Sequence, residues 1–293
     1  NNFALEQLHI NENELTNLDV SSNSALEELS CAYNNLTNLD VSNNLNLQTL
    51  DFDNNNVANL VLGTNTNLSE VSGRYNQLTS VDVSSNTGLT NLNLRNNTFA
   101  TVDVSNNTSL TVLNLNSTGI TSLDITNNTN LSHIYLSGNL LTSIDFLQNP
   151  LLENINLTNN DLTSIDLSNQ TVLRIVRLSG NNLTELDLTT NVALTQVECA
   201  DNNLSSFNFK NGCNQIITDF DASGNPNLSC ILVDDLNKDY TFWTKDVTTS
   251  FSDSYCRYTA IPDANFEAAL AALGYDDISS DGQVPTALIE VIT

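Results

Sequence analysis

The sequence predicts a mainly β solenoid of about ten 21-residue coils, with short parallel strands and few or no helices in the array. The first observation is a strict period, because one apolar column recurs at the same spacing in every copy without insertion. The column contains Leu15, Leu36, Val57, Leu78, Phe99, Ile120, Leu141, Leu162, Leu183 and Leu204. The second is an alternation of apolar and polar residues inside each copy, which indicates strands with one buried face. Since a coil can bury that face only against the next coil, we expect one continuous core along the stack.

Each copy of the repeat divides into two extended halves. The copy that begins at Leu26 reads LEELSCAYNNLTNLDVSNNLN, and its first half alternates around Leu29 and Cys31. Its second half is rich in Thr, Asn, Ser and Asp and too short for helical turns, so we expect a second extended segment on the opposite side. Cys31 and Cys199 fall in a column that Phe and Leu fill in most other copies, which predicts buried core residues and not reactive thiols.

The part of this copy with the pattern LxxLxCxxNxL resembles the leucine-rich-repeat signature LxxLxLxxNxL. It is most similar to the 21-residue type found in secreted and surface proteins of Bacteroidetes. In the leucine-rich-repeat family the Asn is buried and bonds backbone groups at the turn that leaves the strand, where an amide donates and accepts at once. The column here holds Asn13, Asn34, Asn55, Asn76, Asn97, Asn139, Asn160, Asn181, Asn202 and Asn225. Thr118 interrupts it and should mark a locally weaker coil.

The resemblance also implies three parts along the chain. Residues 1–226 are predicted to form the leucine-rich-repeat array, which begins inside a repeat and lacks an N-terminal cap. Residues 227–258 resemble the C-terminal cap of such arrays, which is needed because the last coil would otherwise expose its Leu face. Residues 259–293 resemble the helical N-terminal cap and first strand of a following array. We therefore expect the chain to be a fragment of a larger multi-array protein.

Aromatic residues and turn signals define the two smaller parts. Trp243, Phe242 and Phe251 are the expected cover of the last coil. Pro262 is expected to open an Ala-rich helix that Gly274 closes, before a new apolar segment begins at Ala287.

Cys230 and Cys256 flank the segment that resembles a cap, and in proteins of this type such a pair is joined. The resemblance thus implies a disulfide and an oxidising, extracellular or cell-surface location. Cys213 is then left over, although the sequence alone leaves open a pairing between Cys213 and Cys230.

The charge of the chain excludes two classes of partner. There are 34 acidic residues against eight basic ones, a formal net charge of −26. Such a surface repels nucleic acid and anionic lipid, since binding to either depends on Lys and Arg. No apolar stretch is long enough for membrane insertion as a spanning helix.

An Asp column runs along the second half of the coils. It contains Asp19, Asp40, Asp82, Asp103, Asp124, Asp145, Asp166 and Asp187. Stacking would bring these carboxylates to about 5 Å, where repulsion in water is roughly 1 kcal/mol per neighbour. Hydroxyls such as that of Ser42, together with turn N–H groups, are the expected compensation. A row of weak calcium sites is the alternative, but no DxDxD loop is present.

The candidate ligand-binding residues share one face of the predicted strands. Between residues 1 and 226 there are three Tyr, two His and five Lys or Arg. Eight of these ten fall in the four columns expected to point outward, those of Glu28, Ser30, Ala32 and Tyr33. They are His9, Tyr33, Arg74, Tyr75, Arg95, His133, Tyr135 and Arg177. Tyr and Arg are enriched in binding hot spots, but Tyr also suits exposed strand positions by propensity alone.

These features predict a non-catalytic recognition or adhesion module. Its concave strand face would bind a protein or a carbohydrate. A carbohydrate would be held by ring stacking and hydrogen bonds, and an acidic protein partner by the basic side chains. No catalytic motif occurs, so we expect no enzyme activity, no cofactor and no metal site. Two alternatives remain open: a structural spacer in a long surface adhesin with no specific ligand, and an accessory domain of an extracellular enzyme.

Overall fold

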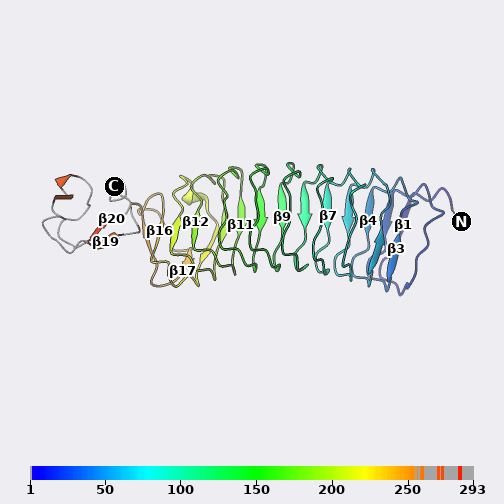
Figure 1. Ribbon diagram of the computed structural model, residues 1–293, viewed down its shortest axis with the longest axis horizontal. Helices are drawn as coiled ribbons and strands as arrows, with labels where there is room; N and C mark the ends of the chain where they lie inside the picture. The colour runs from blue at the N-terminus through cyan, green and yellow to red at the C-terminus, as the bar shows by residue number, and fades with distance from the viewer. Residues whose placement is uncertain are drawn as a thin grey trace.

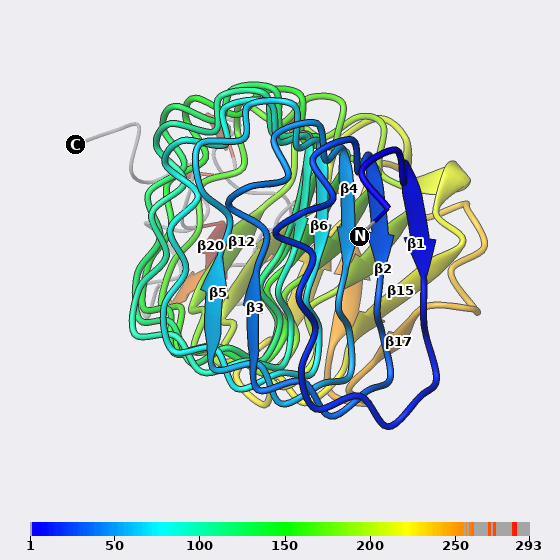
Figure 2. The same ribbon diagram turned by 90° about the vertical axis from the view of Figure 1, so that its right-hand side faces the viewer.

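The protein is a long stack of coils with a β-strand on the same side of almost every coil (Figure 1). The structure is a computed structural model that describes residues 2–254, 256, 258–260, 269–270, 272–273 and 283–285. Viewed along the stack, successive coils superimpose closely (Figure 2). The predicted solenoid is therefore confirmed, and the period of the sequence is its axial repeat.

One side of the stack is a parallel sheet of twelve strands in chain order. Neighbouring strands pair in register at an offset of one repeat, as in Leu8↔Leu29 and Leu92↔Leu113. The strands are β1 (Gln7–His9), β2 (Glu28–Ser30), β4 (Thr49–Asp51), β6 (Glu70–Ser72), β7 (Asn91–Asn93), β8 (Val112–Asn114), β9 (His133–Tyr135), β10 (Asn154–Asn156), β11 (Ile175–Arg177), β13 (Gln196–Glu198), β15 (Asp219–Ala222) and β17 (Thr244–Lys245). We call its solvent side the strand face.

Across the core, the second halves of the coils are extended and pair as strands in two stretches. One stretch pairs β3 (Asn38–Asp40) with β5 (Asn59–Val61). The other is the four-stranded sheet of β12 (Glu185–Asp187), β14 (Ser206–Asn208), β16 (Cys230–Leu232) and β18 (Ser250–Ser252). A single 3₁₀ turn, η1 (Asn214–Ile216), occupies the insertion in the described part of the array. The chain thus follows the expected two extended halves per coil.

The stack continues beyond the ten repeats counted from the sequence. β16 pairs with β14 on one side and with β18 on the other, and β17 pairs with β15. The segment that resembles a cap therefore adds coils to the array while closing it. In the tail, β19 (Tyr258–Ala260) pairs antiparallel with β20 (Gln283–Pro285).

Most of the predicted tail lies outside the described residues. Ala269, Leu270 and Ala272 are helical, but the rest of the helix expected from Pro262 to Gly274 is not described. The apolar segment that begins at Ala287 lies outside the described residues as well.

The core is a set of apolar columns that run the length of the stack. Members of these columns such as Leu26, Leu29 and Leu36 are fully buried, while those of the first coil, such as Leu8, are only partly buried. Cys31 is fully buried as expected, and burial raises the pKa of its thiol to about 12, so it stays protonated and inert. Gly73 occupies the column of Phe52 in the next coil, where an added Cβ would lie 2.1 Å from Cζ of that ring. The Gly therefore makes room for the larger neighbour.

From Asn34 onward the predicted Asn column forms a ladder of buried or half-buried amides, whereas Asn13 in the first coil is exposed and its side chain bonds only its own coil. Nδ2 of Asn160 donates to the carbonyl oxygens of Leu136 in the preceding coil, at 2.9 Å, and Leu157 in its own coil, at 3.0 Å. Its Oδ1 accepts from the backbone N–H of Leu141 at 3.1 Å. The hydroxyl of Thr118 lies within hydrogen-bond distance of two acceptors only, the carbonyl oxygen of Leu115 in its own coil and Oδ1 of Asn139 in the next coil. Each amide therefore ties two coils together, and the Thr118 coil has lost its side-chain bond to the coil before it.

A second buried amide ladder was not anticipated. It runs along the turns that lead into eight successive strands of the twelve-stranded sheet, from β4 to β13, and holds Asn44, Asn65, Asn86, Asn107, Asn128, Asn149, Gln170 and Asn191. Nδ2 of Asn107, for example, donates to the carbonyl oxygens of Val83 and Asn86, both at 2.9 Å. The signal was visible, because this column is Asn in nearly every copy. It was missed because Asn is equally common in exposed turns.

Aromatic residues close the C-terminal end of the core. The ring of Trp243 stacks on Phe220 with centroids 4.1 Å apart and packs edge-on against Phe251 at 5.7 Å. Tyr240 completes the cluster at 4.7 Å from Trp243. The expectation that Phe242 belongs to this cover is wrong, because its side chain is 85% exposed while Trp243 faces inward.

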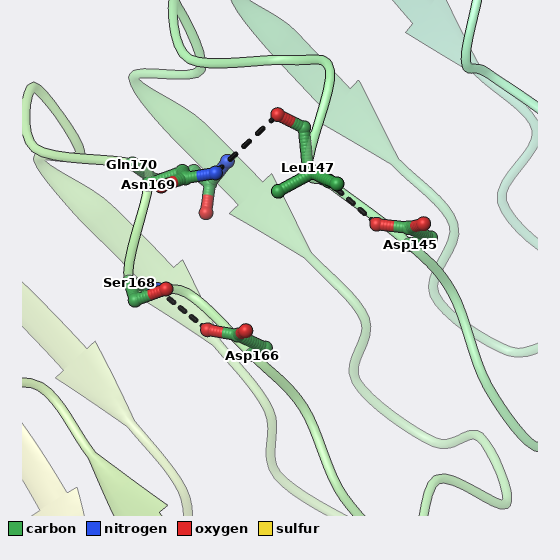
Figure 3. Close-up of a pocket in the computed structure, with 6 residues that line it drawn as sticks. All are labelled: Asp145, Leu147, Asp166, Ser168, Asn169 and Gln170. Atoms are coloured by element: carbon green, nitrogen blue, oxygen red, sulfur yellow. Dashed lines mark hydrogen bonds between the residues drawn. The ribbon is translucent and has the colours of Figure 1, made fainter.

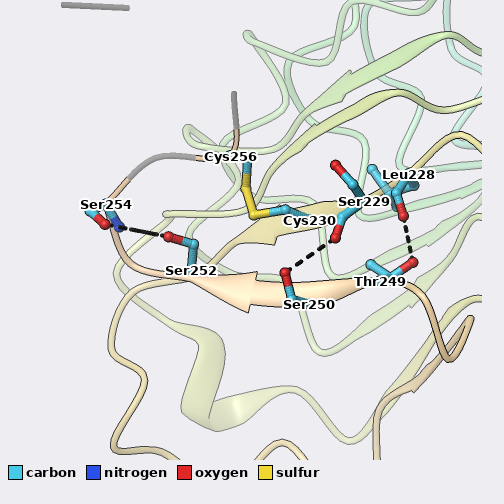
Figure 4. The surroundings of a disulfide bond; sticks show 8 residues. All are labelled: Leu228, Ser229, Cys230, Thr249, Ser250, Ser252, Ser254 and Cys256. Atoms are coloured by element: carbon cyan, nitrogen blue, oxygen red, sulfur yellow. Dashed lines mark hydrogen bonds between the residues drawn. A yellow bond between two sulfur atoms is a disulfide. The ribbon is translucent and has the colours of Figure 1, made fainter. Parts of the chain in front are cut away.

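The structure joins Cys230 to Cys256, as the resemblance implied (Figure 4). Nearby, Oγ1 of Thr249 donates to the carbonyl oxygen of Leu228 at 2.6 Å and ties the strand β18 coil to the one before it. Cys31, Cys199 and Cys213 are free. The disulfide therefore fastens the chain that leaves the last coil back onto β16.

We predict that the Asn and Thr positions of the first ladder contribute differently to the stability of the protein. Asn160→Ala removes three hydrogen bonds inside the core and should lower the free energy of unfolding by about 3 kcal/mol. Thr118→Ala should cost about 1 kcal/mol. Urea unfolding followed by far-UV circular dichroism measures both. Equal losses would contradict the assignment of the ladder as the principal polar tie between coils.

We predict that the disulfide holds the C-terminal coils. Cys230→Ser/Cys256→Ser opens a loop of sequence separation 26 and should cost about 3 kcal/mol. Trp243 is the one Trp in the chain, so its fluorescence reports on this end. Its urea transition should move to lower concentration than the circular dichroism transition of the whole array. A fluorescence transition that stays in place would refute the prediction.

Candidate ligand-binding face

The eight predicted site residues lie on the strand face and on the turn that leaves it, distributed over much of the stack. His133 begins β9, while His9, Tyr135 and Arg177 end their strands, and these four lie on the strand face. Arg74, Arg95, Tyr33 and Tyr75 follow the strands in the turn. His9 and Arg177 lie eight coils apart, roughly 38 Å at the usual strand spacing. The residues therefore share one side of the molecule but do not converge on one point.

In part of the array, one of the four columns expected to point outward does not. Ala32 is 5% exposed and Asp53, one coil on, is 1% exposed. The column turns toward the core because the chain bends there to bring the ladder Asn inside. Long side chains at these positions, such as Arg74 and Arg95, reach out only in part and are half-buried.

Two Tyr residues adopt a backbone conformation that disfavours them. Tyr33 and Tyr75 have φ values of 55° and 54°, in the left-handed region. Most other coils place Asn, Asp or Gly at this position, which tolerate that region better, while Ser117 and Glu12 occupy it in two coils. A bulky residue there costs about 1 kcal/mol or more. Tyr33 and Tyr75 are nevertheless 57% and 45% exposed, so core packing does not account for them.

Tyr75 and Arg95 form the best-defined cluster on this side of the protein. The guanidinium carbon of Arg95 lies 5.0 Å from the centroid of the Tyr75 ring. Nη2 of Arg95 also donates a hydrogen bond to the Tyr75 hydroxyl. The pair presents a rigid platform with an aromatic face and a cation, a combination suited to recognition.

Two of the three Arg side chains among the predicted site residues pair with acidic side chains of the neighbouring coil. Arg74 binds the buried carboxylate of Asp53, with Nε to Oδ2 at 2.5 Å. Arg177 pairs with Glu198 at 3.0 Å, and His9 lies 2.9 Å from Glu28. The sequence did contain a signal, since Asp53 and Glu198 each lie one repeat away from their Arg. The face therefore offers few free cations to an acidic partner.

A solvent-open depression of about 530 Å³ lies on the strand face over β4, β6 and β7. It brings Arg74 together with residues that the sequence did not single out. Its lining consists of Thr49, Leu50, Asp51, Asp53, Glu70, Val71, Ser72, Arg74, Asn91 and Asn93. The lining is polar and hydrogen-bonding.

The Asp column occupies the opposite half of the coils. Each carboxylate accepts from the backbone N–H two residues on, as Asp82 does from Ser84 at 3.0 Å and Asp187 from Thr189 at 2.9 Å. The hydroxyls of Ser84 and Thr189 add bonds of 2.6 and 2.7 Å. The predicted compensation by hydroxyls and turn N–H groups is confirmed. Among the described residues, no group of three or more His, Cys, Asp or Glu side chains is placed to hold a metal ion.

Solved structures with the same architecture are leucine-rich-repeat proteins. The functional domain of InlJ from Listeria monocytogenes is 28% identical, with a TM-score of 0.66 over 86% of this chain and 65% of that chain. A leucine-rich-repeat protein of Leptospira interrogans is 26% identical, with a TM-score of 0.68 over 84% of this chain and 65% of that chain. The fold is that of a leucine-rich-repeat solenoid. This chain thus spans less than two thirds of either of those structures.

A third leucine-rich-repeat structure extends the likeness in fold. YopM, a leucine-rich effector protein from Yersinia pestis, is 21% identical, with a TM-score of 0.65 over 85% of this chain and 74% of that chain. No protein-family model matches the sequence, and no curated protein sequence does so. Leucine-rich-repeat solenoids of this kind typically bind and do not catalyse, because their long repeated surfaces suit extended contacts. In the part of the chain that the structure describes, no helix is long and apolar enough to cross a membrane.

We predict that the Asp column makes stability fall in acid. Hydrogen bonds from Ser84, Ser105 and Ser168, hydroxyl first and backbone N–H second, hold the carboxyl pKa of Asp82, Asp103 and Asp166 below its ordinary value. A depressed folded pKa adds stability above the unfolded pKa, near 4, and that stability is lost as the pH falls through the folded pKa. The urea midpoint should therefore drop below about pH 4.

The variant Asp82→Asn/Asp103→Asn/Asp166→Asn keeps an acceptor for each turn N–H but no longer titrates. Its urea midpoint should fall less than that of the unaltered protein over the same pH range. If both proteins lose the same stability between neutral and acid pH, these carboxylates do not carry the effect.

Proposed function

We propose that this protein is a non-catalytic recognition module that binds a partner protein through its strand face and the turns that leave these strands. The observation that carries the proposal is the pair of exposed left-handed Tyr residues, Tyr33 and Tyr75. Neither core packing nor backbone preference favours Tyr at these positions, so their retention at an energetic cost supports a role in binding. Large aromatic side chains that are already rigid also lose little entropy when a partner covers them.

The contact area that we propose extends over the predicted residues between Tyr33 and Arg177. Its centre is the Tyr75–Arg95 platform, and the depression over β4, β6 and β7 lies beside it. His133 and Tyr135, whose ring centroids are 6.3 Å apart, form a second aromatic point two coils beyond Arg95. The pairing of Arg74, Arg177 and His9 with neighbouring carboxylates argues against an acidic partner.

A carbohydrate ligand is the second candidate. The polar lining of the depression, with Asp51, Asn91 and Asn93, resembles the carboxylate and amide sets that hydrogen-bond sugar hydroxyls. The exposed ring of Tyr75 follows Arg74 in the chain and could stack on a sugar.

We also propose an extracellular or cell-surface location. The disulfide between Cys230 and Cys256 supports it, because such bonds persist in oxidising compartments. The likeness to InlJ, at 28% identity, fits the same location. Membership of the 21-residue Bacteroidetes type, and the presence of further repeat arrays after residue 258 in the same polypeptide, remain part of this proposal.

Binding by the unaltered chain and by Tyr75→Ala/Arg95→Ala/Tyr135→Ala tests the function. A glycan array and a displayed library of folded proteins are the probes. We expect ligands from one of the two probes to lose about tenfold or more in affinity with the variant, since each large aromatic or Arg anchor typically contributes more than about 1 kcal/mol.

The matched control carries three exposed substitutions on the other half of the coils, Thr121→Ala/Thr142→Ala/Thr163→Ala. It should bind like the unaltered chain. Equal binding by the control and the strand-face variant would sink the proposal, and absence of ligands from both probes would favour the structural spacer.

A further inference from the structure

A cluster of exposed apolar side chains lies outside the strand face. Leu147, Leu151, Val172 and Val192 are 58%, 51%, 41% and 48% exposed. All four belong to the turns that lead into β10, β11 and β13. A single exposed Leu is ordinary, but a contiguous apolar group on a soluble surface marks an interaction site. We call these four residues the edge patch.

The register of the sheet brings members of the edge patch into neighbouring turns. Leu151 and Val172 are one repeat apart, and the strands that follow them pair in register. They therefore stack one above the other at about the usual strand spacing of 4.8 Å. In the next turn the pairing of β11 with β13 places Ala193 in this column, and Val192 lies one position before it. Leu147 opens the turn that contains Leu151.

The other coils serve as an internal reference for these positions. The column of Leu147 otherwise holds Ser21, Ser42, Gly63, Ser84, Ser105, Thr126, Ser168 and Thr189. The column of Leu151 and Val172 holds Asn46, Asn67, Gly88, Ser109 and Asn130 in the five coils before it. The fold is thus satisfied by small polar residues at both columns. Since the edge patch side chains are exposed, core packing does not require the change to Leu and Val either.

A small hollow and an acidic rim surround the edge patch. The hollow, of about 180 Å³, is lined by Asp145, Leu147, Asp166, Ser168, Asn169 and Gln170 (Figure 3). Asp145 accepts the backbone N–H of Leu147 at 2.8 Å, so its carboxylate is fixed beside the Leu. Asp166 accepts the backbone N–H of Ser168 at 2.9 Å, and hydrogen bonds from Ser168 hold the pKa of this carboxyl below its usual range.

The rest of the rim is also mainly acidic. Asp187 is exposed one coil beyond Asp166, and Glu153 is exposed two residues after Leu151. Arg174, in the column of Glu153 one coil on, is the single basic residue among them. Four carboxylates therefore face one guanidinium around an apolar centre.

We propose that the edge patch docks a basic, apolar segment of a partner protein, separately from the strand face. Leu- or Phe-type side chains of that segment cover Leu147, Leu151, Val172 and Val192. Its Lys or Arg side chains face Asp145, Asp166 and Asp187. Charge complementarity selects this occupant over a second copy of the chain, because self-association would bring the same carboxylates together on a protein of net charge −26.

The test compares the full chain with Leu147→Ser/Leu151→Asn/Val172→Asn. These substitutions install the residues that other coils carry in the same columns, so the fold should be kept, and they leave the net charge unchanged. The probe is a synthetic amphipathic helical peptide with Leu on one face and Lys on the other. Two matched peptides replace Lys by Glu, or Leu by Ser. Titration calorimetry measures binding, and sedimentation measures the oligomeric state.

We expect the Leu/Lys peptide to bind the unaltered chain and to lose about tenfold or more in affinity with the variant, through lost apolar burial. Raised salt should weaken binding to the unaltered chain. The Leu/Glu and Ser/Lys peptides should bind weakly to both proteins. Leu45→Ser, which removes an isolated exposed Leu, is the control that should change nothing.

Three outcomes would overturn the proposal. Equal affinity of the two proteins for the Leu/Lys peptide would show that charge alone accounts for binding. Equal affinity of the unaltered chain for the Leu/Lys and Leu/Glu peptides would remove the basic requirement. A dimer of the unaltered chain that the variant abolishes would assign the edge patch to a second copy. A negative result with the variant Tyr75→Ala/Arg95→Ala/Tyr135→Ala would not affect these outcomes, because the substitutions on the two surfaces are tested separately.

Discussion

The constraint on which the structure depends is that no coil can bury its own apolar face. A short strand and a few Leu side chains form a core only when another coil lies above and below. Equivalent residues of neighbouring coils must therefore lie above one another, and the buried amides hold the coils in this register. Asn160 bonds carbonyl groups in two successive coils, so a slip of one residue would leave polar groups unpaired in the core. Hydrophobic burial supplies the driving force, and the ladders define the alignment.

This constraint explains how much of the fold could be predicted. The period and the alternation alone predicted core columns such as that of Leu36 and the burial of Cys31, because every copy of the repeat shows the same pattern of apolar and polar positions. The predicted role of the first Asn column held for the same reason. Where repetition stops, prediction weakened. Phe242 and Trp243 are adjacent aromatic residues in an unrepeated segment, and only their backbone course determines which of them faces inward.

The candidate site was harder to predict, because it depends on side chains that meet across coils. The strand face was located correctly in outline, yet Arg74 proved to be held by Asp53, and the column of Ala32 turned inward. Pairing across coils depends on rotamers and on the bend that ends each strand, neither of which the repeat pattern encodes. The left-handed conformation of Tyr33 was also not predicted. The sequence did hold a signal for it, because Gly and Asn occupy the same column in other coils.

In a repetitive chain, each residue can be compared with the residues at the equivalent position of the other coils. A residue that differs from these counterparts is therefore informative within a single sequence. An exposed Leu in an ordinary globular protein has no counterpart against which to judge it. Leu151 has five preceding counterparts in the same column, four of them polar and one Gly, all compatible with the fold. The same reasoning separates Tyr75 from the Asn and Gly residues of its column. Both departures lie on the surface, and both place large apolar groups in an otherwise polar, acidic shell. Function is therefore the remaining physical reason for residues that neither the core, the turns nor the solubility of the protein requires.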